Sequence, residues 1–302
     1  MDFKDFRDRR ILVTGATGFI GRLLTRRLVA AGAAVHGTSR QSQPETPGVV
    51  WHAVDLAQAD AAGRLVRRVA PDAILHLASF VAGARELAAV LPAFQANLAS
   101  TVYLLAAAEE HGVSRFVQAG SLEEPAADEP LPVPSSPYAA AKAGAASYLR
   151  MFHALYGTPV VHARIFMVYG PGQLDLKKLI PYVILARLRG EEVRLSSGTR
   201  PVDWVFVDDV VEGLLRLVLS EGVEGQTVDL GTGQLHTVRD VVEKLYQQLS
   251  PGESPIFGGL EDRAMEQVRQ ARVDATEALL GWRPTTSLDD GLAATIDYYR
   301  QT

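Results

Sequence analysis

"ILVTGATGFIG", at residues 11–21, joins a strand-like run to the start of a helix through three glycines. The glycines, Gly15, Gly18 and Gly21, have the spacing GxxGxxG. Glycine allows a tight turn and a close backbone approach, and the free N–H groups of a helix N-terminus attract a pyrophosphate. A glycine triplet alone can be ordinary turn chemistry. A strand, a glycine loop and a helix in this order predict a dinucleotide site.

Outward from this stretch, short apolar runs alternate with longer helical ones. The strand-like runs as far as Gly170 are ILVTG, AVHGTS, VVWHAV, DAILHLAS, RFVQAGS and VVHARIFMVYG. Helical patterns separate most of them, including one from Phe19 to about Ala31 and one from about Asp60. Such alternation indicates βαβ units. The sequence therefore predicts an α/β fold, a doubly wound parallel-sheet Rossmann domain.

The regular alternation is interrupted twice. Five prolines in the thirteen residues 125–137 exclude helix and central strand, and their place after a strand favours a lid or substrate loop over a domain linker. Beyond Gly170 the pattern is irregular, with brief strand-like returns. We expect a Rossmann domain at 1–168, with a returning segment at about 203–230, and a smaller, discontinuous C-terminal substrate domain at 169–202 and 231–302.

The composition restricts the chemistry. A net charge of −5 and a pI near 5.8 give no general field for nucleic acid or an anionic membrane. The absence of cysteine excludes disulfides, thiolate nucleophiles and cysteine-ligated metals, and no metal site is expected. The N-terminal residues do not resemble a signal peptide, and no run approaches the ~18 uninterrupted apolar residues of a membrane helix. We expect a cytoplasmic protein.

Two residues of "YAAAK", at 138–142, form a candidate acid–base pair. Tyr138 and Lys142 lie four positions apart in a helical pattern and share one face of the helix. A free tyrosine has a pKa near 10, about three units above neutrality. A nearby ammonium and an oxidised nicotinamide would stabilise the phenolate and lower that pKa. An isolated YxxxK would usually be helix surface.

The end of the second strand indicates the cofactor. An NAD enzyme normally has an acid there for the ribose 2′-OH, but "VHGTSR" offers Ser39 and Arg40. A hydroxyl and a guanidinium suit a 2′-phosphate. NADP(H) is therefore expected, and NAD(H) is less favoured. The alternative for Arg40 is an exposed side chain at a strand end.

The chain resembles the extended branch of the short-chain dehydrogenase/reductase superfamily, which includes nucleotide-sugar epimerases, dehydratases and reductases. The resemblance runs nearly end to end, through TGATGFIG, VDL, LHLAS, NLAST, YAAAK, VYGPGQ, KLIP, DWVFVDD, DLGTG and LGWRP. It implies that Tyr138 is the general acid/base and that Lys142 also holds the nicotinamide ribose. The cofactor-binding set that we expect is Gly15, Thr17, Gly18, Phe19, Ile20, Gly21, Ser39, Arg40, Asp55, Leu56, Leu77, Ala78, Ser79, Asn97, Tyr138 and Lys142.

Departures from the family pattern concern the substrate. In "GSLEEPA", Ser121 fits the first family serine, but Leu122 occupies the usual hydroxyl position. Either Ser121 supplies that hydrogen bond or the role is weakened. Glu124 stands where dehydratases of the family keep their base, so it acts on a sugar carbon or serves as a loop carboxylate. The expected substrate contacts are Met167, where the family has asparagine, and Lys178, Arg200 and Arg263, which could equally be plain surface.

Three functions are compatible with these residues. The first is an NADP(H)-dependent keto-reductase acting on a nucleoside-diphosphate sugar. The second is a nucleotide-sugar 4-epimerase or 4,6-dehydratase, which recycles its cofactor. The third is a non-catalytic dinucleotide-binding sensor, against which the intact Tyr138 and Lys142 pair argues. The resemblance also implies a homodimer built by the helices around residues 97–112 and 136–157.

Overall fold

The computed structural model describes residues 3–81, 85–125 and 133–301. The chain forms two compact units. The first comprises Met1–Arg164 and Val211–Val228, and the second comprises Ile165–Val210 and Asp229–Thr302. The expected lid between residues 125 and 137 lies partly outside the described residues.

One sheet of seven strands has the order β3-β2-β1-β4-β5-β6-β9. Its strands are β1 (Arg10–Thr14), β2 (Ala34–Ser39), β3 (Val49–Ala53), β4 (Ala73–His76), β5 (Arg115–Ser121), β6 (Val160–Ile165) and β9 (Thr227–Leu230). All pairs among β1 to β5 are parallel. The chain runs outward from β1 to β3 and then returns to β4 on the other side of β1. This order confirms the doubly wound Rossmann fold and places its switch point between β1 and β4.

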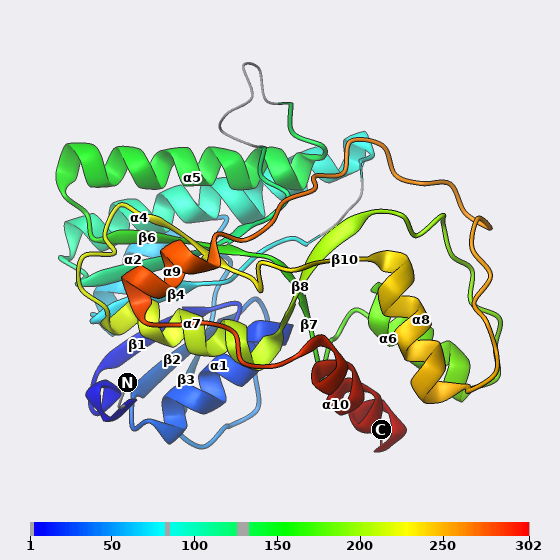
Figure 1. Ribbon diagram of the computed structural model, residues 1–302. Helices are drawn as coiled ribbons and strands as arrows, with labels where there is room; N and C mark the ends of the chain where they lie inside the picture. The colour runs from blue at the N-terminus through cyan, green and yellow to red at the C-terminus, as the bar shows by residue number, and fades with distance from the viewer. Residues whose placement is uncertain (1–2, 82–84, 126–132, 302) are drawn as a thin grey trace. The chain divides into compact units, whose positions relative to one another are not determined.

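Helices cover both faces of this sheet. They are α1 (Phe19–Ala30), α2 (Ala59–Val69), α3 (Val90–Ala93), α4 (Ser100–Glu110), α5 (Pro137–Tyr156) and α7 (Val207–Leu219), with a short 3-10 helix at Phe3–Phe6. Figure 1 shows α2, α4 and α5 on one side of the sheet and α1 on the other. On the α2, α4 and α5 side, Leu65, Leu104 and Leu149 pack with Leu12 and Ile74 of the strands. These buried apolar faces orient the helices on the sheet.

The helix that carries the YAAAK residues, α5, has well-defined ends. Ser136 is its N-cap, and the serine hydroxyl accepts a hydrogen bond from Ala139 N at 3.1 Å. Pro137 occupies the first position, and Gly157 ends the helix with a left-handed φ of 74°. Tyr138 and Lys142 therefore lie in its first two turns.

The helix that we expected near Asn97 begins ten residues earlier. A 3-10 turn (Leu87–Ala89), α3 and a π-helical segment (Phe94–Ala99) lead continuously into α4. Within the described part of the chain, Leu87–Glu110 alone is long and apolar enough to cross a membrane. Polar residues, among them Gln95 and Asn97, interrupt it, which is why no uninterrupted apolar run was found. Packed core helices of globular proteins have the same length and apolar composition.

The second unit has its own sheet and core. The sheet has the order β10-β8-β7, from β7 (Met167–Tyr169), β8 (Pro201–Phe206) and β10 (Leu235–Thr237). Its helices are α6 (Leu179–Leu188), α8 (Val238–Leu249), α9 (Val273–Leu280) and α10 (Leu288–Gln301). Tyr169 packs edge to face on Trp204 and Phe206 in the core.

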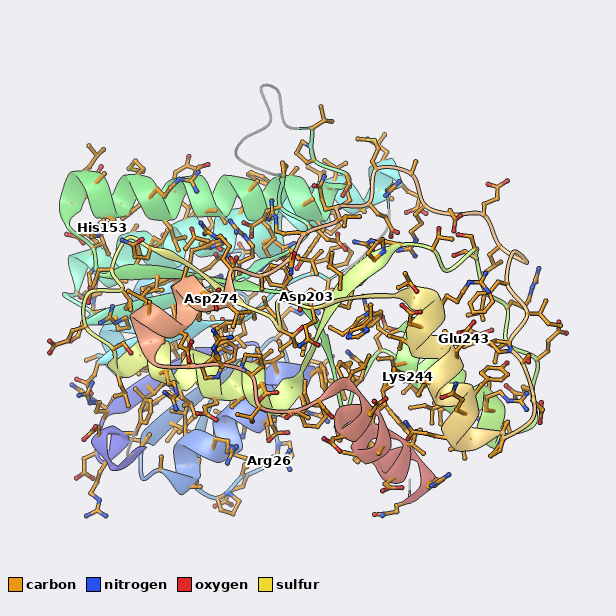
Figure 2. The ribbon with its side chains drawn as sticks, viewed as in Figure 1. Arg26, His153, Asp203, Glu243, Lys244 and Asp274 are labelled. Atoms are coloured by element: carbon orange, nitrogen blue, oxygen red, sulfur yellow. The ribbon has the colours of Figure 1, made fainter. Side chains whose placement is uncertain are left out.

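A buried carboxylate organises the loops of this second unit. Asp203, labelled on β8 in Figure 2, is 1% exposed. It accepts hydrogen bonds from Thr232 N and Oγ1, both at 2.7 Å, from Gly233 N at 2.9 Å and from Ala271 N at 3.0 Å. Four donors satisfy the carboxylate, so Asp203 holds three chain segments together.

Candidate active site

The glycine loop packs too tightly for side chains. Gly15 has φ +67°, and a Cβ there would lie 2.7 Å from Ala78 N, at the end of β4. A Cβ on Gly21 would lie 2.1 Å from Gly15 O. Glycine at these two positions lets the loop contact both the neighbouring strand end and the first turn of α1.

The N-terminus of α1 fits a dinucleotide pyrophosphate. Gly18 is its N-cap, with no side-chain cap among the described residues, and the first turn contains no acid. The backbone N–H groups of Phe19, Ile20 and Gly21 therefore lack intrahelical acceptors, and the positive end of the helix dipole is not neutralised. Thr17 lies in the loop before Gly18. These residues would hold the phosphates of a pyridine nucleotide.

The end of β2 presents an arginine. Arg40 is exposed and has no hydrogen-bond or ion-pair partner within the ranges that the structure describes. The Ser39 hydroxyl accepts hydrogen bonds from Gln41 N at 3.2 Å and Gln43 Nε2 at 3.0 Å. After β3, Asp55 Oδ1 accepts a hydrogen bond from Ala57 N at 3.0 Å in a local turn. The Arg40 guanidinium is thus available to an anion.

Lys142 is fully buried beside Tyr138. Its Nζ donates to Ala119 O of β5 at 2.7 Å and lies 5.8 Å from the centre of the Tyr138 ring. Burial lowers the pKa of Lys142 to about 8, although the charge of Glu124 acts in the opposite direction. The Lys142 ammonium therefore points at a backbone carbonyl of β5, the strand that also carries Ser121.

The expected lowering of the Tyr138 pKa required a bound oxidised nicotinamide as well as Lys142. In the protein by itself, burial raises this pKa, and the nearby hydroxyls of Ser121 and Ser79 act in the opposite direction. Burial is the largest of these effects on the pKa, and the Lys142 ammonium donates its hydrogen bond to Ala119 O. The phenol is therefore protonated at neutral pH, which makes Tyr138 a ready proton donor.

Hydroxyl groups reach Tyr138 from two strand ends. Ser121, at the end of β5, lies near the phenol and acts to lower its pKa, while Leu122 is buried and has no hydroxyl to offer. Ser79 follows β4 and acts on the phenol in the same direction. Ser79 Oγ donates to Asn97 Oδ1 at 2.9 Å. That Ser121 serves in place of the family hydroxyl stays a prediction.

The carboxylate of Glu124 is buried and hydrogen-bonded to neighbouring groups of the protein. It is 4% exposed, and Oε1 accepts from Ser121 N at 2.7 Å. His162 Nε2 lies 2.9 Å from Oε2, and Arg164 Nε lies 4.0 Å from the same oxygen. Although burial opposes ionisation, the charge of His162 and these hydrogen bonds hold the pKa of Glu124 below its ordinary value. This geometry is that of the loop carboxylate rather than of a base free to reach a substrate.

A buried histidine that the sequence reasoning did not single out connects β1, β4 and α4. His76 Nδ1 lies 2.6 Å from Thr14 Oγ1, and Nε2 lies 3.1 Å from Thr101 Oγ1. Thr14 Oγ1 also accepts from Ala78 N at 3.1 Å. Burial lowers the pKa of His76 to about 3, so the ring is neutral. The network fixes the strand ends on both sides of the switch point.

The substrate candidates all belong to the second unit. Met167 is half-buried at the start of β7, and Lys178 is exposed at the N-cap of α6. Arg200 donates to Gln267 O at 2.8 Å and lies 3.2 Å from Glu266 Oε1. Arg263 is exposed. Arg200 therefore already has protein partners, whereas Lys178 and Arg263 extend into solvent.

The fold and this site define an extended short-chain dehydrogenase/reductase. Residues 11–231 match the NAD dependent epimerase/dehydratase family, and the chain belongs to that family. The prediction of an enzyme of the nucleotide-sugar epimerase/dehydratase class is confirmed at this level.

Similar proteins cover nearly the whole chain. A UDP-glucose 4-epimerase of Mycolicibacterium smegmatis is 32% identical over 96% of this chain and 98% of its own. A dTDP-glucose 4,6-dehydratase of Streptomyces griseus is 33% identical over 96% of this chain and 94% of its own. The solved structure of MoeE5 in complex with UDP-glucuronic acid and NAD is 30% identical, with a TM-score of 0.84 over 97% of this chain and 99% of that chain.

Proposed function

We propose that the protein is a nucleotide-sugar 4-epimerase that acts on a nucleoside-diphosphate hexose, with UDP-hexoses as the first candidates. A similar UDP-glucose 4-epimerase and the UDP-sugar complex of MoeE5 support the substrate class. A bound pyridine nucleotide would accept the hydride from the sugar carbon and return it. The residues present at the glycine loop suit such a cofactor.

The observation that carries this choice is the occupied carboxylate of Glu124. Dehydration requires a base that removes a proton from a second sugar carbon, in addition to the redox step. Glu124 has the family position for that base, but both of its oxygens are engaged with Ser121, His162 and Arg164. Epimerisation needs proton exchange only at the hydroxyl of one carbon, and Tyr138 is sufficient for that.

In this mechanism Tyr138 exchanges the proton of the sugar hydroxyl. Ser121 donates a hydrogen bond that orients the phenol or the substrate oxygen. To accept the hydroxyl proton as hydride leaves the sugar carbon, Tyr138 must first be the phenolate, which the nearby charge of Lys142 and the positive charge of a bound oxidised nicotinamide would favour. Ser79, which follows β4, lies near the phenol and is itself held by Asn97.

The decisive test is conversion of UDP-glucose and UDP-galactose by the purified protein with catalytic dinucleotide. We expect each sugar to give a mixture of both, with no net change in NAD(P)H absorbance. A 4-keto-6-deoxy product from UDP-glucose or dTDP-glucose would instead establish a dehydratase. Turnover of a keto sugar that requires stoichiometric NADPH would establish a reductase.

A second candidate, the NADP(H)-dependent keto-reductase, is favoured by Arg40. This arginine is exposed at the end of β2, where no acid follows the strand. If it binds a 2′-phosphate, the lost hydrogen bond should cost about 1.5–3 kcal/mol. Arg40→Ala should then weaken NADPH binding roughly ten- to a hundred-fold and leave NADH binding nearly unchanged.

Titration of both cofactors by calorimetry checks this prediction. The matched control is Arg26→Ala, an exposed arginine on α1 that is labelled in Figure 2. It should change neither affinity. Equal losses for NADPH and NADH in Arg40→Ala, or a wild-type preference for NADH, would contradict a role for Arg40 in binding the 2′-phosphate.

We also propose a homodimer in the cytoplasm. Leu91 and Phe94 of the long helical run and Tyr148 of α5 are large apolar or aromatic side chains that are at least 41% exposed. Covering such side chains in a subunit interface would remove apolar area from water. Light scattering at micromolar concentration should give twice the monomer mass, and a monomer mass would refute the dimer.

A further inference from the structure

We propose that His162 is a positioning residue of the active site. It holds the carboxylate of Glu124, and through that carboxylate it fixes the backbone of Ser121. The role in turnover rests on the proposed function. The site residues matched to the family do not include His162, which lies on β6, the strand next to β5 in the sheet.

The contacts form a continuous buried chain from β6 to the end of β5. Gln118 Oε1 lies 2.7 Å from His162 Nδ1. On the other side of the ring, Nε2 lies 3.1 Å from Glu124 Oε1 and 2.9 Å from Oε2. Oε1 in turn accepts the N–H of Ser121 at 2.7 Å. An ionised carboxylate only accepts, so the contact with Glu124 requires Nε2–H, and the Gln118 amide meets Nδ1 as the donor to a neutral ring or as the acceptor from a protonated one.

Strand β5 is shaped around this pair. A Cβ on Gly120 would lie 2.4 Å from His162 Cε1 and Nε2 and 2.7 Å from Glu124 Oε1. Alternate residues of a strand share a face, so Gln118 and Gly120 of β5 both face the ring. His162 and Glu124 are each 4% exposed. Two polar groups can be buried to this extent without a large desolvation cost only when they are hydrogen-bonded.

The position of the end of β5 affects both Ser121 and Lys142, the two side chains that act on the Tyr138 phenol. Ser121 lies near the Tyr138 phenol, and Ala119 O accepts the hydrogen bond from Lys142 Nζ at 2.7 Å. If Glu124 lost its donor, the carboxylate would turn or take up a proton, and the Ser121 N–H would lose its acceptor. Even a shift of about 1 Å in a catalytic group can lower the rate roughly a hundred-fold.

The test compares two substitutions at the same position. His162→Gln keeps an N–H donor where Nε2 now lies, whereas His162→Leu removes it. We expect His162→Gln to retain kcat within about threefold and His162→Leu to lose roughly a hundred-fold in kcat with little change in KM. Amide-resolved hydrogen exchange should show faster exchange at Ser121 only in His162→Leu. Equal kcat and equal Ser121 exchange in the two variants would overturn the proposal.

His162→Leu leaves a buried carboxylate without its partner and could fail to fold. The double variant Glu124→Leu/His162→Leu removes both polar groups and should fold, but it should show the same fall in kcat and the same fast exchange at Ser121. Wild-type values of kcat and exchange in this folded variant would overturn the proposal.

Glu124→Gln separates positioning from catalysis by Glu124 itself. Its Oε1 can still accept from Ser121, and its side-chain amide can still hydrogen-bond the His162 ring. We expect most of the activity to remain. A loss as large as in the double variant would show that Glu124 is a catalytic base and would overturn the positioning role. If the wild type converts no sugar, the proposed function fails, and the exchange at Ser121 alone decides the role of His162.

Discussion

Tyr138→Phe is expected to lower kcat by roughly 10²–10⁴, the usual loss when a positioned proton donor is removed. The change deletes one hydroxyl from a capped helix whose packing is otherwise unaltered. Fold and dinucleotide affinity should therefore survive. Steady-state epimerisation rates measure the first effect, and thermal unfolding and cofactor titration measure the other two.

The matched control for this prediction is Tyr148→Phe. Tyr148 lies on the same helix, ten residues further along, and its side chain is 41% exposed. Its hydroxyl is remote in sequence from the YAAAK residues, so activity should remain at the wild-type level. A Tyr138→Phe variant as active as this control would refute the proton-exchange mechanism.

Much of the fold could be predicted because the local sequence patterns agree with the strands, turns and helices that the folded chain forms. The run from Ile11 to Val13 reads as a buried strand and is one, and the glycine spacing places the turn between β1 and α1. The helical run before Asn97 was missed because Pro92, Gln95 and Asn97 interrupt its apolar pattern. Its π-helical segment belongs to a rare class of helix that local propensity does not predict.

The part of the site that is formed by residues close in sequence could be predicted. Tyr138 and Lys142 share one helix face, so their pairing follows from spacing. The partners of Glu124 could not be derived in this way, because His162 lies 38 residues away and meets it only when β6 lies beside β5. A polar residue inside an apolar strand pattern, such as His162 in VVHARIF, was the available indication.

The same limit applies to the pKa values. Sequence spacing placed an ammonium near Tyr138 and, together with a bound oxidised nicotinamide, suggested a lowered phenol pKa. In the protein without its cofactor, burial raises that pKa, and Lys142 donates to Ala119 O. Burial depends on the whole fold, so the direction of the shift could not be derived from two residues.

Gly21→Ala should destabilise the fold by about 3 kcal/mol and abolish dinucleotide binding. The new Cβ would lie 2.1 Å from Gly15 O and 2.9 Å from Ala16 Cα, and these are backbone atoms that cannot rotate away. Relief of the clash must displace either the glycine loop or the first turn of α1. Both movements would misalign the N–H groups that face the pyrophosphate.

Gly63→Ala is the control that makes this prediction specific. Gly63 lies inside α2, and within the described residues a Cβ there would meet nothing within 4 Å. The identical substitution should therefore stabilise the protein by about 0.5–1 kcal/mol, because alanine is the better helix former. Chemical unfolding and NAD(P)H titration of both variants measure the contrast. If Gly21→Ala were as stable as Gly63→Ala and still bound the cofactor, the glycine loop could not be the tightly packed cradle described above, and the dinucleotide would have to bind elsewhere.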